Sequence, residues 1–224
     1  MDTSGSAVNM EVIANIFDEK VISPMGFLMS KQVVDQADPA STLHKYIDLP
    51  TDWPIRKLIL RAEEDGVAPW TNISHLKVDE DNEVRVPIDV AIEDYCRVMK
   101  GVWTPVEEQF IGRSAIAGQT LYATPTDYYA TLCGAAVGLD DTFSTDGYSP
   151  GGKIQLASPT GATVKGTARG YLPNHCVEFP FGLQDDLDDW FDVSKVGSLR
   201  ARVTGGGTGI GGTHQIALQQ LRRY

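Results

Sequence analysis

The stretch ISHLKVDEDNEVRVPIDV, residues 73–90, carries the clearest structural signal in the sequence. Its second half alternates apolar side chains with other residues over 84–88, which is the period of a strand with one buried face. Between the two apolar-rich halves lie residues 79–82, DEDN, of types that favour turns. The stretch therefore predicts a β-hairpin with an acidic turn.

Short apolar-rich runs of the same kind continue on both sides of this hairpin, each closed by Gly, Pro or Asp. They lie at 8–17, 27–34, 43–47, 55–60, 110–117, 120–123, 128–133, 153–157, 163–171, 176–179, 198–203 and 215–221. The best helical pattern is a single one, at 89–100, where Ile92, Tyr95, Cys96 and Met99 share one stripe. Roughly a dozen short strands with one or two helices predict an all-β sandwich or barrel.

Eight strands fill one jelly roll, so the surplus of strands leaves two architectures open. The first is a minimal double jelly roll, two tandem vertical rolls with one or two short helices. Its halves are expected at residues 1–104 and 105–224. The alternative is one jelly roll decorated with extra strands.

The composition narrows the classes of function. The 224 residues carry a net charge of -11, and no Lys/Arg cluster occurs beyond Arg222 and Arg223. Because such a surface repels phosphates, we expect no direct sequence-specific nucleic-acid binding. Three cysteines without CxxC spacing indicate reduced thiols in a protein made in a cytoplasm. The sequence shows no signal peptide and no long apolar run, so we expect a soluble protein.

Two glycine-rich motifs suggest nucleotide binding only by their spelling. Residues 147–153 match GxxxxGK, but Ile154 stands where a Ser or Thr would bind magnesium. Residues 207–212 match GxGxxG, yet too few residues follow for a crossover helix and a second strand. We therefore predict no cofactor.

No catalytic or metal-binding motif is present either. The four histidines are isolated from one another, and no GxSxG elbow occurs. We predict no catalytic residue, no metal site and no enzymatic activity. The candidate cation ligands are the carboxylates of an acidic segment, Asp185, Asp186, Asp188 and Asp189. The favoured alternative is a solvated acidic turn whose Leu187, Trp190 and Phe191 form a helical turn against the core.

Three tryptophans in predicted loops are candidates for contacts between subunits: Trp53, Trp70 and Trp103. Large aromatic side chains dominate both protein interfaces and protein cores. The sequence leaves both interpretations open.

Two parts of the chain resemble a known family. Residues 44–95 contain the hairpin described above and the strands before it. The last strands of the same family are matched by three C-terminal segments: HCVEFPFG (175–182), DDWFDVSKVGSLRARVTGG (188–206) and HQIALQQLRRY (214–224). Both parts resemble jelly-roll major capsid proteins of icosahedral bacterial and archaeal viruses with an internal membrane, the double jelly-roll lineage. Residues 1–40 and 105–170 carry no matching motif.

The resemblance implies a structural protein of the virion that is made in the host cytoplasm. Its copies would assemble as homotrimeric capsomers. Expected partners are neighbouring capsomers, penton and minor capsid proteins, and the internal lipid membrane. The family contributes no active site and no cofactor. The rival interpretation is a jelly-roll carbohydrate- or receptor-binding module, such as a lectin or spike, and a cupin-type enzyme ranks third.

Overall fold

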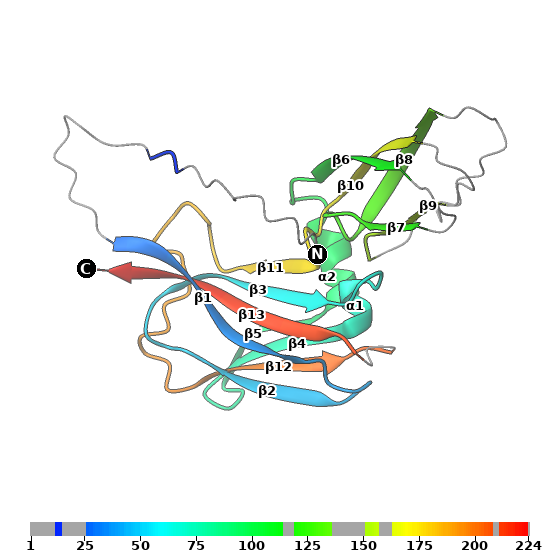
Figure 1. Cartoon of the computed structure of the whole chain (residues 1–224). Coiled ribbons are helices and arrows are strands. Elements are labelled where there is room, and N and C mark those ends of the chain that lie inside the picture. Colours follow the sequence, from blue (N-terminus) through cyan, green and yellow to red (C-terminus); the bar gives the residue numbers. More distant parts are fainter. Residues whose placement is uncertain are drawn as a thin grey trace.

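The computed structural model describes residues 12–14, 26–113, 119–135, 151–156, 163–207 and 211–223 (Figure 1). In these residues it contains strands β1 (Gly26–Ala37), β2 (His44–Leu49), β3 (Ile55–Glu63), β4 (Ile73–Glu80), β5 (Arg85–Ala91), β6 (Val106–Arg113), β7 (Gln119–Tyr122), β8 (Tyr128–Ala135), β9 (Lys153–Leu156), β10 (Thr163–Gly170), β11 (Cys176–Pro180), β12 (Leu199–Gly205) and β13 (Thr213–Arg223). Helices α1 (Pro69–Asn72) and α2 (Ile92–Met99) complete the described elements. The prediction of an all-β protein is confirmed.

Eight of the strands form two four-stranded antiparallel sheets. Sheet A has the order β1-β13-β3-β11 and sheet B the order β2-β12-β4-β5. Apart from the β4–β5 hairpin, each strand is followed along the chain by one in the opposite sheet. In both sheets a late strand lies between two early ones (Figure 1). This interleaved order defines a jelly roll.

The pairing crosses the expected domain boundary between residues 104 and 105. Strand β12 pairs with β2 and β4, and β13 pairs with β1 and β3. A half that ended at residue 104 would lack the central strands of both sheets. Of the two architectures expected from the sequence, the described residues therefore form the decorated single jelly roll.

The extra strands form a module inserted between α2 and β11. Strands β6, β10 and β8 make an antiparallel three-stranded sheet, and β7 pairs with β9. Figure 1 shows this module beside the end of the sandwich where α1 and α2 lie. The module is local in sequence, because the described pairs between its strands join residues from Val106 to Gly170.

Alternating side chains fill the core between sheets A and B. On β12, Leu199, Ala201 and Val203 point inward and are buried, while the residues between them are partly exposed. Strand β13 repeats the pattern with the buried Ile216 and Leu218. Burying each large aliphatic side chain contributes about 1.5–3 kcal/mol, so the two strands supply much of the stability of the sandwich.

The predicted hairpin is present, and its turn has an unusual backbone. Asp81, Asn82 and Glu83 all have positive φ angles, of 48°, 57° and 69°. Asp and Asn tolerate this left-handed region better than most residues. The side chain of Asp81 also accepts a hydrogen bond from the Ser198 backbone N–H at 2.8 Å. The turn is thereby tied to the start of β12.

Helix α2 begins later than the predicted helix at 89–100. Asp89 and Val90 still pair with Lys77 and Leu76 of β4, so β5 continues to Ala91 before the helix starts. Helix α2 closes one end of the sandwich with its buried residues Ile92 and Cys96. None of the helices in the described part of the chain is long and apolar enough to span a bilayer.

Candidate interaction surfaces

Two of the three candidate tryptophans pack against the core. Trp70 lies in α1 and contacts the core cluster. Trp103 makes an edge-to-face contact with Tyr95 at 5.9 Å between ring centroids, and Tyr95 stacks on Phe179 at 4.5 Å. Both tryptophans remain partly exposed. The structure thus places them in packing positions, and a role in subunit contacts stays a prediction for both.

Trp103 also borders a hollow of about 400 Å³ at the base of the inserted module. The hollow lies between the end of α2, the start of β6 and the segment leading into β11. Its lining is largely apolar and includes Val102, Trp103, Val106, Tyr171 and Pro173. Val102 is itself 75% exposed, so the rim presents apolar surface to solvent.

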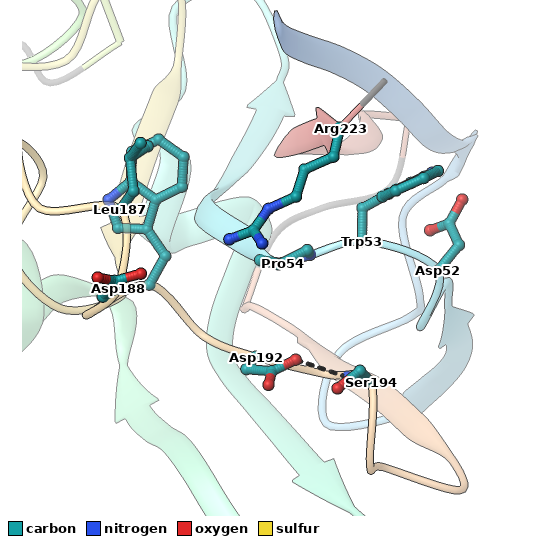
Figure 2. Close-up of a pocket in the computed structure, with 9 residues that line it drawn as sticks. Asp52, Trp53, Pro54, Leu187, Asp188, Asp192, Ser194 and Arg223 are labelled. Atoms are coloured by element: carbon teal, nitrogen blue, oxygen red, sulfur yellow. Dashed lines mark hydrogen bonds between the residues drawn. The ribbon is translucent and has the colours of Figure 1, made fainter. Parts of the chain in front are cut away.

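The third tryptophan, Trp53, lies in the loop between β2 and β3. The loop is fixed by Gln220, whose buried side-chain amide donates to Asp52 Oδ1 at 3.0 Å and to the Trp53 carbonyl at 3.2 Å. Trp53 lines a hollow of about 340 Å³ whose opposite wall includes Leu187 and Asp188. Figure 2 shows the indole directed away from Leu187. Trp53 is partly exposed, like Trp70 and Trp103, and its role in subunit contacts likewise stays a prediction.

Between β11 and β12, the acidic segment forms a loop that is closed by internal hydrogen bonds. We call residues 183–189 the acidic loop. The Leu183 backbone N–H donates to Asp189 Oδ2 at 2.6 Å, and the Asp188 N–H donates to Asp186 Oδ1 at 3.1 Å. Trp190 is buried beneath the loop, and its indole N–H donates to the Leu183 carbonyl at 3.0 Å. The expected helical turn is therefore wrong: side-chain and backbone hydrogen bonds close a non-helical loop, and Leu187 stays exposed.

The carboxylates of this loop do not converge on one point. Asp185, Asp186, Asp188 and Asp189 are all exposed. Within the described ranges, no three His, Cys, Asp or Glu side chains are grouped as a metal ion would require. A cation site at these aspartates thus stays an untested prediction, and the loop geometry favours the solvated acidic turn.

The outer face of sheet B carries polar and charged side chains from all four strands. Arg200 of β12 lies 3.3 Å from Asp79 of β4, whose side chain is 3% exposed. The same guanidinium lies over the ring of Tyr46 on β2 at 4.9 Å. These contacts of Arg200 link the three neighbouring strands β2, β12 and β4.

The inserted module is joined to the roll through a buried polar contact. Thr126 Oγ1 donates to the Leu172 carbonyl at 2.8 Å and accepts the His175 backbone N–H at 3.2 Å. Asp127 forms an ion pair with Lys100 at the end of α2. Gly66 and Gly151 meet at the same joint, where a Cβ on Gly151 would lie 2.3 Å from the Gly66 carbonyl carbon.

The cysteines with described side chains are poor nucleophiles. Burial raises the pKa of Cys96 to about 12, with the Asp127 carboxylate adding to the effect. Burial likewise raises the pKa of Cys176. Because their pKa values are raised, both thiols are protonated at neutral pH. They react slowly, because the thiolate is the reactive form. Neither is arranged for covalent catalysis.

Comparison with known proteins gives two structural neighbours. No protein-family profile and no curated protein matches the sequence. The STIV major capsid protein aligns over 88% of this chain and 49% of its own, with 12% identity and a TM-score of 0.43. The major capsid protein P2 from bacteriophage PM2 aligns over 88% of this chain and 98% of its own, with 12% identity and a TM-score of 0.24. The present chain thus spans about half the length of the STIV protein.

Proposed function

We propose that this protein is a viral major capsid protein whose copies assemble into capsomers of an icosahedral shell over an internal membrane. One observation carries the proposal. The segments that resemble capsid proteins, 44–95 and those within 175–224, coincide with seven of the eight strands of the jelly roll. Of the two parts without matching motifs, 105–170 corresponds to the inserted module and 1–40 contains the remaining roll strand, β1. The resemblance therefore falls on the roll itself rather than on its decoration.

In this proposal the capsomer is a homotrimer. Its further partners are neighbouring capsomers, penton and minor capsid proteins, and the internal lipid membrane, and its location is the virion. The physical character of the roll supports such a role. Strands pair along nearly their whole length in each sheet, which gives a rigid unit that loses little freedom when it is packed into a shell.

The proposal is tested by the mass of the purified full-length chain in solution. Native mass spectrometry and sedimentation velocity over a range of protein concentrations should detect a species of three times 24.4 kDa, and larger assemblies as concentration rises. A chain that remains monomeric at every concentration and salt condition would contradict the proposal.

A carbohydrate- or receptor-binding module is the second candidate, and the hollow beside Trp103 favours it. Sugar rings and apolar side chains bind to aromatic surfaces, and this hollow offers Trp103 and Tyr171 with an apolar rim. Under this alternative, a glycan array probed with the monomeric protein would give specific binding, and Trp103→Ala would abolish it. Binding that survives this substitution would remove the hollow as the site.

A further inference from the structure

Two cross-strand rows on the outer face of sheet B bring basic side chains together. Their neighbours in sequence, such as Ala201, Val203 and Leu76, point into the core, so the row residues point outward. From β2 to β5, the first row is Tyr46, Arg202, Lys77 and Asp89, and the second is His44, Thr204, His75 and Ala91. We take the four nitrogen-bearing side chains of the two rows together and call them the basic row: Arg202, Lys77, His75 and His44.

Arg202 stands out within the basic row because no carboxylate of the described residues forms an ion pair with it, and Glu83 attracts it only at longer range. Lys77 Nζ lies 2.6 Å from Glu83, and His75 Nε2 lies 3.3 Å from Asp89. Arg202 has no hydrogen bond or ion pair with any residue that the structure describes, and its Nε is buried without a partner. It is directly opposite Lys77, and like charges in that arrangement repel. An anion bound at Arg202 would give its buried Nε a partner and would oppose its repulsion by Lys77, whose own charge Glu83 already partly offsets.

The protein itself provides matching anions on its other sheet. In the acidic loop, the carboxylates of Asp186 and Asp189 accept the backbone hydrogen bonds that close the loop. Asp185 and Asp188 are exposed and have no hydrogen-bonding or ion-pair partner for their carboxylates within the described ranges. The contact of Trp190 with the Leu183 carbonyl and the closing hydrogen bonds fix the loop that carries Asp185 and Asp188. Little conformational freedom is therefore lost on binding.

The basic row and the acidic loop cannot meet within one molecule. The acidic loop is attached to sheet A, where Arg56 of β3 donates to the Gln184 carbonyl at 3.0 Å. The basic row lies on the outward side of sheet B, with the core between the two. Contact between them therefore requires a second copy.

We propose that the basic row of one copy, centred on Arg202 and Lys77, binds the Asp185 and Asp188 carboxylates of a second copy. The inference rests on the proposed capsid function and identifies one contact by which copies assemble. Because the two surfaces differ, the contact is heterologous and repeats from copy to copy, which produces a closed ring or a continuing lattice. The recognised chemistry is a pair of carboxylates on a rigid loop.

The test is a charge swap in the full-length chain. Arg202→Glu and Asp188→Arg should each raise the midpoint concentration of assembly by about tenfold or more, because each places like charges in contact. The combined variant R202E/D188R restores opposite charges and should return the midpoint to near that of the wild type. Circular dichroism checks that each variant folds. Asp188→Arg lies on an exposed loop and tests the contact even if Arg202→Glu does not fold.

A matched control swaps charges away from the proposed contact. Glu107 and Arg169 are exposed and directly opposite one another in the inserted module, so E107R/R169E preserves both net charge and local pairing. This variant should assemble like the wild type. If the single variants assemble normally, or the R202E/D188R chain is no better than the singles, the contact is wrong while the capsid proposal stands. A wild-type chain that never associates overturns both.

Discussion

His214 Nδ1 lies 3.0 Å from Asp38 Oδ1, and both side chains are fully buried. The other ring nitrogen of His214 is 3.0 Å from the Gln36 amide. This contact joins the start of β13 to the end of β1 and the residue after it, far apart in the sequence. It belongs to the long-range contacts that close the jelly roll.

Replacing Asp38 with Ala should lower the free energy of unfolding by about 2 kcal/mol or more, because it leaves a buried ring nitrogen without its partner. Urea denaturation monitored by tryptophan fluorescence measures the change. Asp35→Asn, at an exposed position near the end of β1, is the control and should cost less than about 0.5 kcal/mol. Equal effects of the two substitutions would mean that the buried pair does not stabilise the fold.

Acidification should weaken the joint between the roll and the inserted module. Burial lowers the pKa of His175, with nearby Arg61 adding to the effect and the carboxylates of Glu63 and Asp65 opposing it. An unfolded histidine has a pKa of about 6.5, so below that pH the unfolded chain binds a proton that the folded chain resists. Stability is therefore complete above about pH 6.5 and falls as the pH drops through the folded value.

The variant His175→Asn isolates this effect. Asparagine tolerates the positive φ of 62° at this position and carries no titrating group. Urea denaturation between about pH 7.5 and 5 should show a smaller loss of stability for the variant than for the wild type. Parallel pH profiles for the two proteins would rule out His175 as the source.

Gly151→Ala should disrupt the same joint by a different mechanism. The residue has a φ of 119°, and the added methyl group would lie 2.3 Å from the Gly66 carbonyl carbon. We expect a loss of about 2 kcal/mol or more and faster tryptic cleavage in the inserted module. Gly207→Ala is the control, since nothing lies within 4 Å of its Cβ position. A stable, protease-resistant Gly151→Ala variant would contradict the close approach.

Cys96 should react with iodoacetamide at pH 8 at least about a hundredfold more slowly than it does in the urea-unfolded chain, because burial holds its thiol protonated. Peptide mass spectrometry after timed labelling gives the rate for each cysteine separately. Cys176 is less buried and should react faster than Cys96 in the folded protein. Rapid labelling of Cys96 under native conditions would show that α2 does not pack as described.

The sequence was most informative where structure depends on neighbouring residues. The alternation over residues 84–88 and the turn-forming DEDN predicted the β4–β5 hairpin, because both signals are local. The same alternation in Leu199, Arg200, Ala201, Arg202 and Val203 contains the signal that places both arginines on one outward face. It does not show that the Arg202 Nε is buried without a hydrogen-bond partner among the described residues, because that depends on the neighbouring strands.

The strand partners could not be predicted, because β12 and β13 pair with strands about 120 to 200 residues away and no local pattern encodes that choice. A count of strands alone therefore favoured two rolls over one. Helical spacing also misled at Leu187, Trp190 and Phe191. There, the Asp189 carboxylate holds the Leu183 N–H and closes a loop instead of a helical turn.

Electron microscopy of the purified full-length protein tests the central claim most directly. At high protein concentration the account predicts discrete capsomers, or sheets and closed shells built from them, with the jelly roll as the repeating unit. Fields of single, unassociated particles under all conditions, together with specific binding of the monomer to a glycan, would contradict it.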